Sequence, residues 1–240
     1  QYPDPAYFAG ALVLRSVDGG ASWSALPAQP ALSWTQDFAV SAADPQWLAV
    51  SDGNQLMVSN DGGASWSART LPAGGAGCGL VTTIALHPTS TSGAVVGCTG
   101  NGVHVTTDFA SASPTWTAWT PAGGLTANGT DPVQASVIAL HPAYAGTPTA
   151  WIGTHDGGLF RSTNGGTNWT AINTGYEAVN IRALAAHPLD SGPGTVVLAG
   201  QGDAFTTSRA VMKSPDSGGT WQLANSGLNA EQIRSIAIDP

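Results

Sequence analysis

A short pattern recurs five times along the chain and constrains its fold more than any other feature. Each copy has Ser or Thr, then Asp or Asn two residues later, then glycines or small residues, and finally Trp. The marker residues of these repeat turns are Ser16, Asp18 and Trp23; Ser59, Asp61 and Trp66; Thr106, Asp108 and Trp116; Ser162, Asn164 and Trp169; and Ser214, Asp216 and Trp221. Successive Trp residues are 43 to 53 positions apart. Such spacing is typical of proteins built from stacked or radially arranged units.

A second marker recurs with the same period. The dipeptides that close an apolar alternating run are Asp44-Pro45, His87-Pro88, His141-Pro142, His187-Pro188 and Asp239-Pro240. Together the markers predict one pattern per repeat: strand, His-Pro or Asp-Pro turn, strand, Gly-rich turn, strand, repeat turn and strand. Four short strands in roughly 40–50 residues form one blade of a β-propeller. The sequence therefore predicts an all-β propeller of five four-stranded antiparallel blades.

The two ends of the sequence read as parts of one repeat. Residues 233–240 resemble an innermost strand, and residues 1–28 resemble the other three strands of the same blade. This predicts a ring closed by pairing of the N- and C-terminal segments, which removes exposed sheet edges. We expect one propeller domain over residues 1–240, with blades at 233–240 plus 1–28, 36–71, 81–121, 135–173 and 180–224. A whole number of repeats cut from a longer array would look equally cyclic, so that alternative stays open.

The repeat turn has a structural explanation. An Asp or Asn side chain accepts hydrogen bonds from backbone N–H groups a few residues on, and glycines adopt backbone angles that other residues avoid. The Trp that follows begins the outermost strand, where its ring is buried between sheets and its N–H finds an acceptor. We therefore expect Asp18, Asp61, Asp108 and Asp216 to be structural, and we expect no metal site or cofactor.

These turns resemble the BNR or Asp-box repeat, Ser-x-Asp-x-Gly-x-Thr-Trp. That repeat occurs in sialidases, sortilin-type receptors, xyloglucan-active glycoside hydrolases and a photosystem II assembly factor, and the resemblance covers the whole chain. It implies a β-propeller but no particular activity, because those families share the turn and not their chemistry. Two copies depart from the pattern: the third has a longer stretch, 109–115, before Trp116, and the fifth carries the extra residue Ser217.

Composition and charge narrow the class of partner. Only 9% of the residues are charged, against about a quarter in a typical soluble domain. The formal net charge of −8 repels the phosphates of nucleic acids, so no nucleic-acid partner is expected. The sequence has no run of eighteen apolar residues, so no membrane span is expected.

The two cysteines bear on the compartment. Cys78 and Cys98 flank the first two predicted strands of one blade and are candidates for a disulfide, which requires an oxidising environment. Two buried free thiols are the alternative. We expect a secreted or extracellular protein, and a periplasmic or cell-surface location fits as well.

One face of the predicted propeller carries the candidates for ligand binding. The connections between blades share it with the loops between the second and third strands, and we call it the loop face. Seven of the fifteen acidic residues fall there: Asp37, Asp52, Asp131, Asp156, Glu177, Asp203 and Glu231. Aromatic rings among carboxylates suit sugars, because a pyranose has apolar C–H faces and hydroxyls. The candidate ligand-binding residues are Trp34, Asp37, Asp52, His155, Asp156, Tyr176, Glu177 and Asp203.

Several of these candidates also have structural interpretations. Trp34 would cap a blade junction, Tyr176 would pack under its own loop, and Asp156 would belong to a Gly-rich turn. The histidines that precede proline are expected to bond locally within their turns: His87, His141 and His187. Only His104 and His155 fall outside that register.

The sequence leaves three function classes open: a lectin-like binding module, a glycoside hydrolase, and a structural or assembly protein. A glycoside hydrolase needs two carboxyl groups about 5 to 10 Å apart across a sugar pocket, and the acidic loop face could supply them. The sialidase set is incomplete, because there is no Arg-Ile-Pro segment and the repeats account for Arg182 and Arg234, which hold equivalent places in first strands. We therefore expect a binding or scaffold module that contacts a glycan or another extracellular protein through the acidic loop face. The alternative is a glycoside hydrolase that uses paired carboxylates on that face.

Overall fold

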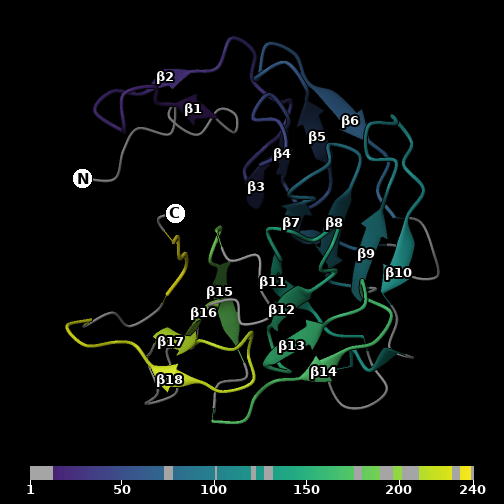
Figure 1. Cartoon of the computed structure of the whole chain (residues 1–240). Coiled ribbons are helices and arrows are strands. Elements are labelled where there is room, and N and C mark those ends of the chain that lie inside the picture. The colour runs from purple at the N-terminus through teal and green to yellow at the C-terminus, as the bar shows by residue number, and fades with distance from the viewer. Residues whose placement is uncertain are drawn as a thin grey trace.

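The computed structural model describes residues 13–72, 78–100, 102–119, 123–126, 132–175, 180–189, 197–201, 211–228 and 233–238. These residues form four four-stranded antiparallel sheets and one two-stranded sheet. The sheets are arranged around a common centre as the blades of a propeller (Figure 1). The prediction of an all-β propeller with four-stranded antiparallel blades is confirmed. In the ranges described, no helix is long and apolar enough to cross a membrane.

In the four four-stranded blades the strands lie side by side in chain order, and the first strand is the innermost. We number the blades 1 to 5 along the chain. Blade 1 has the pair β1 and β2 among the described residues. The bounds are β1 (Leu14–Arg15) and β2 (Ser24–Ala25) in blade 1; β3 (Asp37–Val40), β4 (Leu48–Ser51), β5 (Leu56–Ser59) and β6 (Ser67–Arg69) in blade 2; β7 (Val81–Leu86), β8 (Ala94–Cys98), β9 (Gly102–Thr106) and β10 (Thr117–Trp119) in blade 3; β11 (Ala135–Leu140), β12 (Ala150–Thr154), β13 (Leu159–Ser162) and β14 (Thr170–Ala171) in blade 4; and β15 (Ile181–Ala186), β16 (Val197–Gln201), β17 (Val211–Ser214) and β18 (Gln222–Leu223) in blade 5.

Each repeat turn is closed by its own polar side chains. In all five copies the Ser or Thr hydroxyl donates to Oδ1 of the Asp or Asn two residues on, at 2.5 to 3.0 Å. In four copies the same oxygen accepts the backbone N–H four residues farther on, as Asp61 does from Ser65 at 2.9 Å. In the longer third copy that N–H belongs to Thr115 and reaches Asp108 at 2.8 Å. The turn thus fixes the hairpin between the third and fourth strands of a blade.

Neighbouring blades approach each other closely at a glycine on the second strand. A Cβ atom at this position would clash with a side chain of the next innermost segment, so only glycine fits. Three equivalent pairs show this contact: Gly97 with Ala135, Gly153 with Ile181, and Gly200 with Ile233. The glycines therefore bring the inner strands together around the centre of the propeller.

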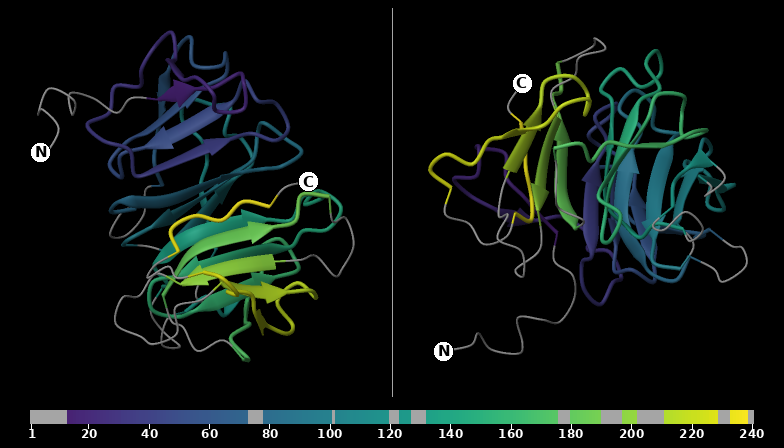
Figure 2. Two further views of the ribbon diagram at one scale, coloured as in Figure 1. Left: turned by 90° about the vertical axis from the view of Figure 1, so that its left-hand side faces the viewer. Right: turned by 90° about the horizontal axis from the view of Figure 1, so that it is seen from below.

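The C-terminal segment 233–238 takes the place of an inner strand. Ile233 faces Gly200 just as Ile181, at the start of β15, faces Gly153. Figure 2 shows the segment running along the blade that contains β15. Its predicted pairing with the N-terminal segment involves residues 1–12 and 239–240, which lie outside the described residues. Closure of the ring by strand exchange therefore stays a prediction.

The Trp residues of the repeat turns connect blades farther from the centre. Three indole N–H groups donate to a carbonyl of the preceding blade: Trp66 to Ala28 at 3.0 Å, Trp116 to Thr70 at 2.8 Å and Trp221 to Ile172 at 2.8 Å. Trp169 donates within its own turn and packs against Trp119 of blade 3, with ring centroids 5.1 Å apart. Trp23, at the outer edge of blade 1, is 62% exposed.

A disulfide joins Cys78 to Cys98. It connects the residues that precede β7 to the last residue of β8, at the loop-face end of blade 3. Both cysteines are buried. The bridge therefore reinforces the first hairpin of this blade next to the centre of the propeller.

The repeat turns make a specific prediction about pH. Hydrogen bonds, chiefly from the Ser65 hydroxyl, lower the pKa of Asp61 from 3.8 to about 2. Because the folded-state pKa is depressed, this carboxylate stabilises the fold above pH 3.8, and the contribution is lost as the pH falls through about 2. We expect a carboxyl-carbon NMR titration of Asp61 to show a midpoint near 2. The variant Asp61→Asn, which imitates Asn164, should remove that share of the acid dependence of unfolding, and a midpoint at the ordinary value would contradict this account.

The C-terminal segment makes a second prediction. Deletion of residues 233–240 should remove the packing of Ile233 on blade 5 and leave Gly200 of β16 uncovered. Loss of one large aliphatic side chain from a packed site costs about 2–5 kcal/mol, so the melting temperature should fall by several degrees. The measurement is calorimetric unfolding beside the variant Leu228→Ala, which truncates an exposed aliphatic side chain. A deletion variant that melts like the intact chain would rule out the assigned role of the segment.

Candidate functional site

One position of the repeat places a polar side chain at the centre of every blade. It lies four residues before the end of the inner strand, and in the C-terminal segment it lies four residues before Ile238. The five residues at this position, which we call the inner ring, are Gln36, Thr82, Ser136, Arg182 and Arg234. All five line one cavity of about 620 Å³, which we call the central cavity. This volume lies within the range of about 300–1,000 Å³ that small-ligand sites occupy.

β-Bulges orient three members of the inner ring. The register of the first two strands shifts at Val81/Thr83, at Ala135/Val137 and at Ile181/Ala183. The extra residue in each case belongs to the inner ring: Thr82, Ser136 or Arg182. A bulge changes the direction of the side chain that it contains and often lies next to a functional site.

Two members of the inner ring join neighbouring blades. The Thr82 hydroxyl donates to the Ala135 carbonyl at 2.5 Å. The Ser136 hydroxyl donates toward the Ile181 carbonyl, and it also lies 3.1 Å from the Gly153 carbonyl. Because a hydroxyl has one proton to donate, these two side chains offer a ligand only acceptor oxygens.

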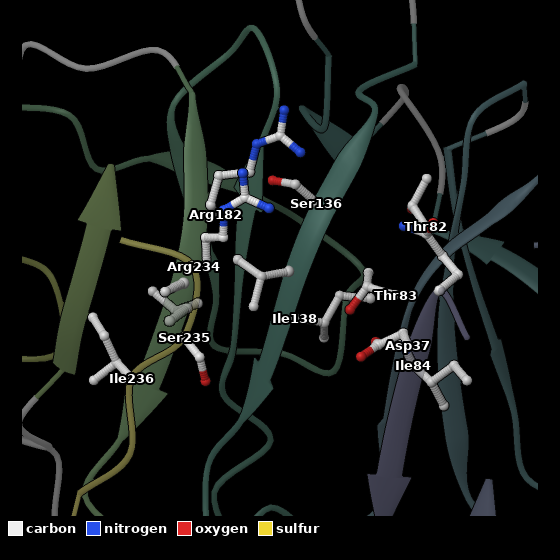
Figure 3. Close-up of a pocket in the computed structure, with 14 residues that line it drawn as sticks. Asp37, Thr82, Thr83, Ile84, Ser136, Ile138, Arg182, Arg234, Ser235 and Ile236 are labelled. Atoms are coloured by element: carbon white, nitrogen blue, oxygen red, sulfur yellow. Dashed lines mark hydrogen bonds between the residues drawn. The ribbon is translucent and has the colours of Figure 1, made fainter. Parts of the chain in front are cut away.

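Two other members of the inner ring are cationic. Arg182 and Arg234 are both exposed and line the central cavity from neighbouring segments. Figure 3 shows their guanidinium groups at the same end of the cavity, near Ser136. The Arg182 Nε–H donates to Asn180 Oδ1 at 3.1 Å. Because arginine stays protonated in proteins, both guanidinium groups carry a positive charge at any physiological pH.

Asp37 lies across the cavity from the arginines (Figure 3). Its Oδ1 accepts the Phe38 N–H at 2.9 Å, and its Oδ2 accepts the Ile84 N–H of the next blade at 2.7 Å. Burial raises the pKa of this carboxyl, and the two backbone hydrogen bonds act in the opposite direction. Both carboxylate oxygens therefore already accept a hydrogen bond, and the bond to Oδ2 connects blade 2 to blade 3.

The remaining wall of the cavity is partly apolar. Ile84, Ile138 and Ile236 line it from three different segments (Figure 3). No Trp, Tyr or Phe side chain is found among the described residues of this lining. The cavity therefore combines an aliphatic surface with a cationic end.

A smaller hollow of about 220 Å³ adjoins the central cavity and shares lining residues with it. Four inner-ring residues also line this hollow, and His155 and Gln134 complete its polar rim. The His155 backbone N–H donates to the Gln134 carbonyl at 3.0 Å, which holds the β12–β13 loop at the rim. The His155 side chain is exposed.

The structure separates the predicted ligand-binding residues. Asp37 and His155 line the two adjoining hollows. Asp52 is buried and accepts backbone N–H groups of its own turn, from Asn54 at 3.0 Å and Gln55 at 2.9 Å. Asp156 is exposed in the β12–β13 loop, and Trp34 is 46% exposed but lines neither hollow. The remaining loop-face candidates lie outside the described residues: Tyr176, Glu177, Asp203, Asp131 and Glu231.

The turn histidines accept hydrogen bonds within their turns. In each case Nδ1 accepts the backbone N–H two residues on: His87 from Thr89, His141 from Ala143 and His187 from Leu189. His104 is buried within β9. Across the described ranges, no three His, Cys, Asp or Glu side chains gather in a way that could hold a metal ion.

Reasoning from the sequence overlooked the inner ring. The two arginines were explained by their equivalent places in the repeat, whereas the structure shows that those places converge on one cavity. The available signal was the alignment of inner strands, in which one position is polar in all five repeats. Among the described residues, the charged side chains that line the cavity are Arg182, Arg234 and Asp37, and the predicted acidic loop face stays a prediction.

Comparisons with known proteins agree on the fold. No protein-family model and no curated protein matches the sequence. Three solved structures are similar: an ancestral GH74 enzyme (TM-score 0.59, 16% identity, 95% of this chain and 31% of that one), the GH74 enzyme of Niastella koreensis (0.50, 18%, 90% and 36%) and YCF48 bound to D1 peptide (0.53, 17%, 91% and 62%). This chain therefore spans less than two thirds of each of these proteins. At such identities the likeness shows a shared β-propeller fold.

Proposed function

We propose that this chain is a binding module that takes its ligand at the mouth of the central cavity, on the loop face. The observation that carries the proposal is the convergence of the five inner-ring residues on one cavity. Polar residues at this position are not needed to build a strand, yet all five repeats of the sequence have one. A concave site with a few convergent polar groups and an apolar wall is the usual form of a ligand site.

The chemistry of the cavity favours a protein partner over a neutral glycan. A pyranose is usually held against an aromatic ring, and the described lining offers none. A peptide can place an aliphatic side chain against Ile84 and Ile138 while its polar groups meet the inner ring. One similar structure is that of YCF48 bound to D1 peptide, so the fold is compatible with such a ligand.

The glycoside hydrolase alternative has less support. Asp37 is the one carboxylate among the described residues that line the cavity, and both its oxygens accept backbone N–H groups. A hydrolase needs a second carboxyl within about 10 Å. The similarity to two GH74 structures concerns the fold.

The compartment is also part of the proposal. A disulfide such as Cys78–Cys98 persists only in an oxidising environment for a typical mesophilic protein. We propose a secreted or extracellular location, where the partner would be another extracellular protein. Mass spectrometry of the native protein, with and without reduction, can detect the Cys78–Cys98 bridge.

Blocking the mouth tests the site. Gln36 is exposed and lines both hollows, so Gln36→Trp should fill the entrance. We expect at least a tenfold loss of affinity for whichever members of a random decapeptide panel the unmodified chain retains. The matched control is Gln222→Trp, at an exposed position of the outermost strand β18.

Two outcomes would contradict the proposal. Equal retention by the Gln36→Trp variant would place the ligand elsewhere. Release of reducing ends from polysaccharides by the unmodified chain, and not by the Gln36→Trp variant, would favour the hydrolase instead.

A further inference from the structure

We propose that blade 1 carries a second binding site, separate from the central cavity, which takes an extended segment of a partner protein with a large aliphatic or aromatic side chain. The site is formed by Gly20 and Trp23 of the repeat turn and by Leu14 of β1, and we call it the outer socket. The proposal is carried by the other blade junctions, where a segment of the preceding blade occupies the equivalent place.

The second glycine of a repeat turn receives a side chain from the preceding blade. A Cβ atom on the glycine would clash with that side chain, so the missing Cβ makes room for it. Three junctions show this contact: Leu26 on Gly63, Trp119 on Gly166 and Ile172 on Gly218. Each of the three incoming side chains is the third residue after a repeat-turn Trp, and each is buried. The repeat turn therefore forms a socket for a large apolar group from outside its own blade.

Main-chain groups hold the incoming segment as well. Between blades 1 and 2, the Ala28 N–H donates to the Gly63 carbonyl at 3.0 Å, and the Trp66 indole N–H donates to the Ala28 carbonyl at 3.0 Å. Leu26 packs on the same glycine. Residues 26–28 are thus bound by one apolar contact and two hydrogen bonds. In complexes of extended peptides, main-chain hydrogen bonds give affinity and side-chain pockets give specificity.

The outer socket has the same groups but is open. Among the described residues, only Trp23 of the same turn lies within 4 Å of a Cβ atom placed on Gly20. Trp23 is 62% exposed, and Leu14 is 44% exposed. The side chains that hold the place of Leu14 in blades 2 to 5 are only 4–8% exposed: Met57, His104, Phe160 and Met212.

In the complete junctions these positions pack around the incoming side chain. Met212 and Trp221 of blade 5 form one apolar cluster with Ile172 of blade 4. The junction of blades 3 and 4 has residues of the same three positions in one cluster. Leu14 and Trp23 are therefore two walls of a site whose third member comes from outside blade 1, and covering them removes apolar surface from water.

Blade 5 does not provide a matching side chain. The third residue after Trp221 is Ala224, which is exposed. The residues at this position in blades 1 to 4 are all large: Leu26, Arg69, Trp119 and Ile172. Ala224 would leave a void where those side chains make contacts, and voids cost packing free energy. A second copy of the chain would present the same alanine, so the occupant that fits is a segment of another protein.

The probe for this proposal is the peptide acetyl-Ser-Ala-Leu-Pro-Ala-amide, which copies residues 24–28 and therefore the segment that blade 2 binds. We expect it to shift the NMR signal of the Trp23 indole N–H, with a dissociation constant on the order of 1 mM. Replacing the Leu of the peptide by Ala should weaken binding at least about tenfold, because the apolar contact is lost. Replacing it by Ile should keep the affinity within about threefold.

Matched variants of the chain locate the site. Leu14→Ala should weaken binding of the peptide about fivefold, because one apolar wall is truncated. Its control is Leu189→Ala, which truncates a 69% exposed side chain in the turn after β15 and should keep the affinity within about twofold. Trp23→Phe keeps an aromatic ring but loses the N–H donor, so it should weaken binding about fivefold. Fluorescence anisotropy of a dye-labelled peptide measures each affinity, and thermal unfolding verifies that each variant is folded.

Several results would overturn the outer socket. They are equal binding of the Leu and Ala peptides, equal affinities of Leu14→Ala and Leu189→Ala, and no shift of the Trp23 signal up to roughly 10 mM peptide. Sedimentation of the chain alone tests a competing occupant, since a dimer that is lost in Leu14→Ala would assign the socket to a second copy. A Trp23 indole N–H that is protected from hydrogen exchange in the monomer would assign it to blade 5 of the same chain.

Discussion

The close approach of the second strand of one blade to the inner segment of the next blade determines the centre of this propeller. It depends on a missing Cβ atom at equivalent positions, of which Gly153 is an example, because any side chain there would collide with the following blade. Protein interiors tolerate little change in volume, so this contact fixes the spacing between blades. The inner-ring residues face a common space because their strands are held at that spacing. The convergence of these side chains on one cavity therefore depends on the contact between each glycine and the next inner segment.

Most of the blade pattern could be predicted from the turn sequences that recur along the chain. The repeat turns and the His-Pro and Asp-Pro dipeptides mark strand ends by local hydrogen bonding, which is why the blade pattern could be read without structural information. The β-bulge at Ser136 could not be read, because one extra residue leaves no periodic trace. The roles of Asp37 and Asp52 were also hidden. A carboxylate that accepts backbone N–H groups and one that awaits a ligand look the same in a sequence.

Most of the described charged residues that line the central cavity differ in sign from the net charge of the chain. The formal net charge is −8, yet two guanidinium groups and one carboxylate line the central cavity. The net charge of the molecule repels an anion at long range, and salt screens this repulsion beyond about 10 Å. The charges that line the cavity act only at short range, whereas electrostatic steering depends on the charge of the whole molecule.

The blade junctions also have a direction. One side of a junction presents a repeat turn with its Trp, and the other presents the end of an outermost strand, as in the contact of Trp66 with Ala28. Such a contact is heterologous, because its two halves differ. Because these two halves follow each other in the same order at each such junction, the series of blades has a direction, as the subunits of a filament do. Gaining or losing a repeat in evolution therefore requires no new kind of interface, only a change in curvature.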